Sequence, residues 1–121
     1  MAVSDSFLTF VLGQLDGVRD VTWRRMFGGV GLYAGERFFG LIDNDRLYFK
    51  ADDATVVDYT REGMGPFRPG PSQAASMKYY EVPVSVLEDA GELARWARRS
   101  VDVAPAAARE PRRRKRPGRQ M

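Results

Sequence analysis

The segment that most constrains the fold is Trp23–Lys50, in which two polar turn sequences separate short apolar runs. The turns are Ala34–Arg37 and Asp43–Arg46, and the runs beside them are rich in β-branched, aromatic and aliphatic residues. Short runs joined by tight turns predict a three-strand antiparallel meander. The middle run, Phe38–Ile42, is apolar on both faces. We therefore expect it to be the central strand, or to present its outer face to a partner such as a second copy of the chain.

The regions on either side of this meander predict helices and one further strand. Apolar residues at helical spacing predict an amphipathic helix over Asp5–Leu15, with Asp5 or Ser6 as its N-cap. After the meander we expect a helix from Asp52–Asp53 to about Glu62 and a proline- and glycine-rich loop over Met64–Ser76. A strand at Met77–Val82 and a last helix that starts with a Ser85–Glu88 capping box follow. The buried stripe of this last helix consists of Val86, Leu87, Ala90, Leu93, Trp96 and Ala97. The order helix, three strands, helix, strand, helix predicts a two-layer α+β fold with helices packed on an antiparallel sheet.

Charge divides the chain into two parts. Seven of the 19 Lys and Arg residues lie at 104–121 beside a single acid, Glu110, so positions 1–103 hold 12 basic and 15 acidic residues. We assign 1–103 to one folded domain and 104–121 to a disordered tail, because the tail has almost nothing apolar to bury. The tail either solubilises the protein or pairs with phosphates through charge, without sequence preference. Its candidate nucleic-acid contacts are Arg112, Arg113, Arg114, Lys115, Arg116 and Arg119.

The composition removes most of the usual catalytic chemistry. The chain contains no cysteine and no histidine, which excludes disulfides, thiolate nucleophiles, imidazole bases and the common zinc-ligand sets. The glycines at 29, 31 and 35 lack the spacing of a dinucleotide-binding loop, and the acids at 43–45 and 52–53 lack the register of a calcium-binding loop. We expect no enzymatic activity, no cofactor and no metal.

Two sequence features bear on where the protein resides. No apolar run approaches the roughly 20 residues needed to span a bilayer. The first residues lack a basic segment ahead of an apolar core, so no secretory signal is expected. We expect a cytoplasmic protein that does not bind membranes.

The arginine pair Arg24-Arg25 is the candidate contact on the folded part. In one interpretation the pair lies at an exposed strand end and is neutralised by acids such as Asp20 or Glu81; in the other it faces an anion or a partner beside Tyr33. Both remain open at this stage.

Aromatic residues provide further candidates. Lys78 and Tyr79 are candidate partner contacts, and Tyr79-Tyr80 beside Lys78 can stack on a nucleic-acid base, although packing within the sheet is the more frequent role of such residues. Trp23 and Trp96 are most simply core or core-edge aromatics.

Several motifs in order support a family resemblance. They are Arg24-Arg25-Met26-Phe27-Gly28-Gly29 with Gly31-Leu32-Tyr33, Leu47-Tyr48-Phe49-Lys50, Gly63-Met64 with Pro66-Phe67, Met77-Lys78-Tyr79-Tyr80-Glu81-Val82-Pro83 and Leu93-Ala94-Arg95-Trp96-Ala97. Over roughly residues 5–100 the sequence resembles the N-terminal domain of the TfoX/Sxy family. The resemblance implies a small, non-enzymatic α+β domain of bacterial proteins linked to competence genes, acting with the cyclic-AMP receptor protein at promoters. Longer members carry a second domain where this sequence has its basic tail, so we expect a stand-alone domain.

Two functions from different classes follow. The first is a regulatory interaction module, monomeric or homodimeric, whose folded body docks on a protein partner while the tail contacts nucleic acid. The family resemblance implies that this partner belongs to the transcription machinery. The alternative is a small-ligand binder or enzyme that uses a groove between the sheet and the Met64–Ser76 loop.

Overall fold

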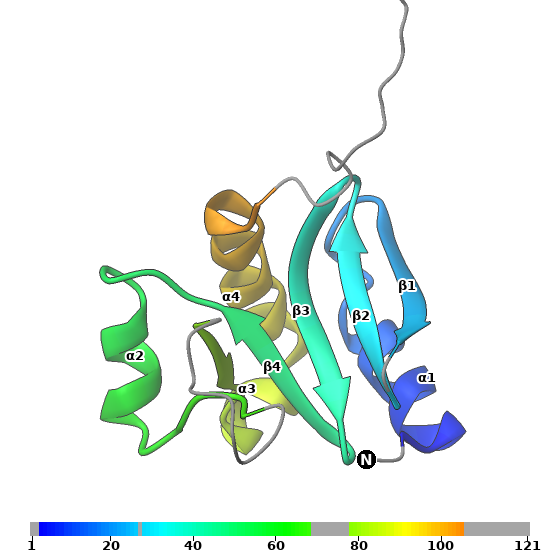
Figure 1. Ribbon diagram of the computed structural model, residues 1–121, viewed down its shortest axis with the longest axis horizontal. Coiled ribbons are helices and arrows are strands. Elements are labelled where there is room, and N and C mark those ends of the chain that lie inside the picture. Colours follow the sequence, from blue (N-terminus) through cyan, green and yellow to red (C-terminus); the bar gives the residue numbers. More distant parts are fainter. Residues whose placement is uncertain (1–2, 27, 69–77, 106–121) are drawn as a thin grey trace, which may run out of the picture.

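One five-stranded antiparallel sheet, with strand order β1-β2-β3-β4-β5, organises the fold. Figure 1 shows the computed structural model, which describes residues 3–26, 28–68 and 78–105. The strands are β1 (Val21–Met26), β2 (Gly29–Ala34), β3 (Arg37–Asp43), β4 (Arg46–Lys50) and β5 (Tyr79–Glu81). The helices are α1 (Asp5–Gln14), α2 (Val56–Arg61), α3 (Val84–Leu87) and α4 (Ala90–Val103). The α+β architecture predicted from the sequence is confirmed.

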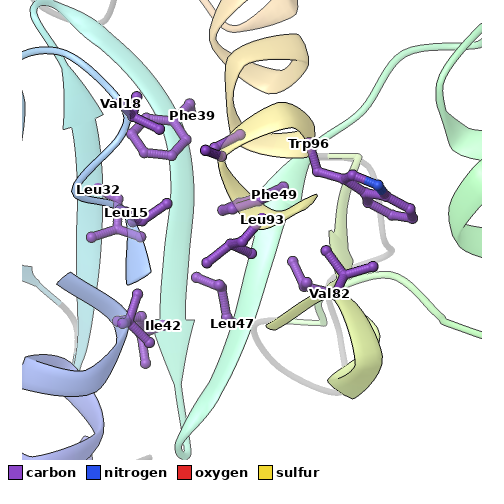
Figure 2. Close-up of a cluster of buried hydrophobic side chains, with 14 of the residues drawn as sticks. Leu15, Val18, Leu32, Phe39, Ile42, Leu47, Phe49, Val82, Leu93 and Trp96 are labelled. Carbon is purple, nitrogen blue, oxygen red and sulfur yellow. The ribbon is translucent and has the colours of Figure 1, made fainter. Parts of the chain in front are cut away.

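The helices cover one face of the sheet. Helix α4 lies behind β3 and β4 in the view of Figure 1, and α1 and α3 pack beside it. On this inner face the buried side chains form one core, several of which Figure 2 labels. Leu15, Leu32, Phe39, Ile42 and Leu93 are almost completely buried there. Full burial of each such side chain contributes roughly 1.5–3 kcal/mol to folding.

The central strand β3 contains an irregularity that directs two neighbouring aromatic residues to different faces. The register between β2 and β3 shifts between Leu32 and Tyr33, so that Leu32 faces Gly40 while Tyr33 faces Phe38. The extra residue, Phe39, enters the core, and Phe38 contacts Tyr33 on the outer face. A bulge of this kind lets β3 be apolar on both faces, as its sequence predicts, while remaining central.

The meander has four strands rather than the predicted three. In addition to the predicted runs, residues Val21–Met26 form β1, because the β-branched Val21 and Thr22 favour extended structure and the strand continues to Met26 in antiparallel pairing with β2. The additional strand was missed because the residues between its two ends are all exposed, so it shows no alternation of buried and exposed positions.

Two helix starts and one loop also differ from the prediction. Ser4, rather than Asp5 or Ser6, caps α1 by accepting the amide of Phe7 at 3.1 Å. Asp89 caps α4 through the Glu92 amide, so the predicted Ser85–Glu88 box is wrong and the last helix is divided into α3 and α4. Part of the loop predicted to be irregular pairs with β5, since Pro66 bridges Tyr80.

Helix α2 is shorter than predicted. It begins at Val56, because the Asp52 carboxylate accepts the amides of Ala54 and Thr55 and thereby closes a turn before the helix. These hydrogen bonds, with that to the Thr55 amide the largest cause, lower the pKa of Asp52.

Candidate interaction surface

The outer face of the sheet, opposite the helices, carries a row of aromatic rings. Tyr33 stacks on Phe38 with ring centroids 5.2 Å apart, and Phe38 contacts Tyr79 at 5.1 Å. The three residues come from β2, β3 and β5, and the bulge in β3 is what brings Phe38 to this side. Nearby, Tyr48 of β4 meets Phe67 edge-on at 5.1 Å.

Two cations lie over this row. The Arg24 guanidinium is 5.0 Å from the centroid of the Tyr33 ring, and the Lys50 ammonium is 5.1 Å from that of Tyr79. Such cation–π contacts attract the charge to the face of the ring. Burial, and then the charge of Lys78, lower the pKa of Lys50.

Tyr79 is part of the sheet's internal packing. Only 3% of it is exposed, and its hydroxyl donates a hydrogen bond to the Phe38 carbonyl at 2.7 Å. Burial raises the pKa of this phenol, so it stays protonated. Its ring packs against that of Phe38 in a tilted arrangement, and its burial leaves no face for a stacked base.

The two arginines of the pair lie on opposite faces of β1. Arg24 is aligned with Gly31 and faces outward, whereas Arg25 is aligned with Val30 and reaches toward the helix side, where it pairs with Asp5 at 3.3 Å. The acids expected from the sequence were Asp20 or Glu81, but Glu81 pairs with Arg46 instead. The side chains of Arg25 and Asp5 are largely exposed, so this ion pair contributes little to stability.

Lys78 lies apart from the arginines. Its ammonium pairs with Asp53 at 3.0 Å, and the hydrogen bond from Asp53 raises the pKa of Lys78. Among the sequence candidates, the structure therefore brings Arg24, Tyr33 and Tyr79 to one face and separates Arg25 and Lys78 from them.

Trp23 was misjudged from the sequence. It is 43% exposed on β1, on the same side as Leu32, and its ring lies 5.7 Å from the Arg25 guanidinium. Trp96, by contrast, is buried in the core as predicted, edge-on to Tyr59. Position in an outermost strand explains the exposure of Trp23, and no local sequence signal distinguishes an outermost strand from an inner one.

The candidate nucleic-acid contacts of the tail lie outside the described residues, as do residues 69–77 of the loop that would line the alternative ligand groove. The last described residues contact the start of β3: Arg37 donates to the Ala104 carbonyl at 2.8 Å, and the Phe38 amide donates to the Pro105 carbonyl at 3.3 Å. Residue 105 is therefore held at the end of the sheet where β3 begins.

The described residues offer neither a metal site nor a membrane-spanning helix. Within residues 3–26, 28–68 and 78–105, no group of three or more acidic side chains is placed to hold a metal ion. No helix in the same ranges has the length and apolar character needed to cross a membrane.

Fold and surface together define a small α+β domain with an exposed, arginine-bearing outermost strand and, on the outer face of the sheet, a partly buried row of aromatic rings. The chain belongs to the TfoX N-terminal domain family, because the sequence model of that family matches residues 13–104. Membership supports a regulatory type of domain. A comparison with curated proteins finds no match.

Proposed function

We propose that this protein is a non-enzymatic regulatory interaction module that docks on an acidic surface of a partner protein through β1, while the basic tail contacts nucleic acid without sequence preference. A role in transcription or competence is the family context in which such a module would act. The proposal is supported chiefly by the exposure of Thr22–Arg25, four consecutive residues of a regular strand that include a tryptophan and two arginines.

The composition of this strand favours a protein partner over solvent alone. Tryptophan and arginine are the residues most enriched at the energetic centres of protein interfaces. Trp23 is one of only a few large apolar side chains left exposed in the described ranges, the others being Phe10, Val57 and Val84. The two arginines flank it in space, one on each face of the sheet, and complement negative charge on a partner.

Affinity capture with charge-reversed variants tests the proposal. The wild-type chain, a chain ending at Pro105 and the double variant Arg24→Glu/Arg25→Glu are each used to capture proteins from a lysate of the native host, with and without nuclease. We expect the wild-type chain and the chain ending at Pro105 to retain the same protein, with and without nuclease. The double variant should not retain it.

The matched control is Arg61→Glu/Arg68→Glu, which makes the same change of net charge at two exposed positions far from β1 in the chain. Capture should be unaffected by this control. Retention that is equal for both double variants, or that disappears with nuclease, would rule out a protein partner at β1.

A further inference from the structure

The β5 edge of the sheet is covered by another segment of the chain, whereas the β1 edge is not covered by any described residue. Beyond β5, the segment Gly65–Phe67 runs alongside: the Glu81 amide donates to the Gly65 carbonyl at 3.0 Å and the Phe67 amide donates to the Tyr79 carbonyl at 2.6 Å. Along β1, none of the residues that the structure describes pairs with the outer edge. A six-residue strand with an uncovered edge is a template for another strand.

The backbone groups available at that edge follow from the pairing with β2. The Gly35 amide donates to the Asp20 carbonyl at 3.1 Å, which directs the polar groups of Asp20 toward β2. Antiparallel pairing alternates this direction along the strand, and the β1–β2 register is regular from Val21 to Met26. The amides and carbonyls of Val21, Trp23 and Arg25 therefore point to the free edge, while those of Thr22 and Arg24 are used by β2.

The side chains at the same edge alternate in chemistry. Trp23 lies on the helix side of the strand and Arg24 on the outer side, where its described contact is with the ring of Tyr33. Arg25 already has Asp5 as a partner. An added strand would thus meet an apolar ring on one face and a cation without a described acid on the other.

A second copy of the chain is a poor occupant for this edge. Pairing of β1 with itself would bring the four arginines of two copies into one seam, and like charges across paired strands are destabilising. An acidic strand has the opposite effect, since it neutralises the same charge.

We propose that β1 accepts an extended segment of the partner protein as a sixth, antiparallel strand, with acidic side chains facing Arg24 and apolar side chains facing Trp23. This inference rests on the proposed function and specifies how its partner docks. Because Arg24 directs its backbone toward β2, the residue opposite it belongs to a pair without mutual hydrogen bonds. Side chains approach most closely in such pairs, which favours a direct carboxylate contact with Arg24.

The first test uses a designed peptide as a stand-in for the partner. A fluorescein-labelled nonapeptide of alternating glutamate and valine places its carboxylates on one face and its apolar groups on the other. We expect it to bind the full chain at least about tenfold more tightly at low salt than a peptide of alternating lysine and valine. Hydrogen exchange measured by NMR should slow at the amides of Val21, Trp23 and Arg25, with little change at Thr22 and Arg24. Equal affinity for the two peptides, or binding without that alternation of protection, overturns the proposal.

A pair of substitutions isolates the backbone contribution. Trp23→Ala and Trp23→Pro both remove the indole, but only the proline variant also removes the amide that points outward. Provided that both variants keep the melting temperature of a folded domain, Trp23→Pro should bind the glutamate peptide about tenfold more weakly than Trp23→Ala. Equal affinity of the two variants would contradict strand addition.

A charge exchange keeps the test decisive if the proline variant fails to fold. Arg24→Glu should reverse the preference from the glutamate to the lysine peptide, whereas Arg19→Glu, an exposed position before β1, should not. An unreversed preference contradicts the contact with Arg24. A dimeric mass in solution together with protected Val21, Trp23 and Arg25 amides in the free protein would assign the edge to a second copy instead.

These results are separable from the proposed function. A partner captured equally by the wild type and by Trp23→Pro, but lost with Arg24→Glu/Arg25→Glu, shows that the module docks through the side chains of β1 without strand addition. Peptide binding at β1 without any captured partner supports the strand-addition site and removes support for the regulatory role.

Discussion

At single residues, close packing in the sheet explains why certain glycines are required. A Cβ at Gly29 would lie 2.6 Å from the Ile42 carbonyl oxygen, and one at Gly40 would lie 2.9 Å from the Tyr48 carbonyl oxygen. Gly31 differs, because its nearest neighbour at 2.7 Å is the terminal methyl of Met26, which can rotate away. The glycine motif that marks the family therefore has, at Gly29, a purely structural reason.

Gly29→Ala should reduce the free energy of unfolding by about 2 kcal/mol, because a backbone carbonyl in a central strand cannot move aside without cost. Gly13→Ala is the matched control: it lies in α1 with no atom within 4 Å of the added Cβ, so it should stabilise the protein by about 0.5–1 kcal/mol. Urea unfolding at equilibrium measures both changes. If Gly29→Ala reduces the free energy of unfolding no more than Gly31→Ala does, the packing explanation is contradicted.

Among the secondary-structure elements, α2 is held to α4 by a partly buried ion pair. The Arg99 guanidinium donates to the Asp58 carboxylate and lies 5.1 Å from the centroid of the Trp96 ring. This hydrogen bond is the main cause that lowers the pKa of Asp58. Two further nitrogens of Arg99, Nε and Nη2, are buried without a hydrogen-bond partner in the described ranges. The Asp58 carboxylate is therefore the main group that offsets the cost of burying the Arg99 charge.

Asp58→Asn should destabilise the protein near neutral pH by about 1–3 kcal/mol, since it leaves a partly buried guanidinium without its anion. The pH dependence should also change. A lowered folded-state pKa gives stability that is fully present above the unfolded pKa of about 3.9 and is lost as the pH falls through the folded pKa. The wild type should therefore lose more stability than the variant between about pH 5 and pH 2. Melting temperatures across this range measure the difference, with the exposed Asp53→Asn as control; parallel curves would exclude the ion pair as the source.

The sequence predicted the helices and strands that have one buried, apolar face. Helix α1, strands β2 to β5, α2 and the stripe of α4 all have apolar residues at regular spacing, and each was predicted near its observed place. Strand β1 was largely missed because its exposed residues carry no such pattern, and the α3–α4 break because two acceptable caps, Ser85 and Asp89, compete within five residues. The outer-face row of Tyr33, Phe38 and Tyr79 depends on a bulge and on pairing between distant strands, neither of which local sequence specifies.

At the scale of the whole molecule, charge is separated between a mildly acidic domain and a strongly basic tail. The tail begins from a fixed point, because Arg37 and Phe38 hold Ala104 and Pro105 at one end of the sheet. Phe38 is also a member of the outer-face row. The backbone amide of this aromatic residue thus contacts Pro105, the last described residue.

Ending the chain at Pro105 should abolish retention on duplex DNA at low salt while leaving the melting temperature nearly unchanged, because the contacts of Arg37 and Phe38 are kept. Binding by the full chain should weaken with salt, with a log–log slope of about −0.9 for each phosphate that the tail neutralises. A full-length variant with the seven tail cations replaced by glutamine separates charge from length and should behave like the shortened chain. If either variant retains DNA as well as the wild type does, the body carries the contact, and Arg24 and Lys50 become the first residues to substitute.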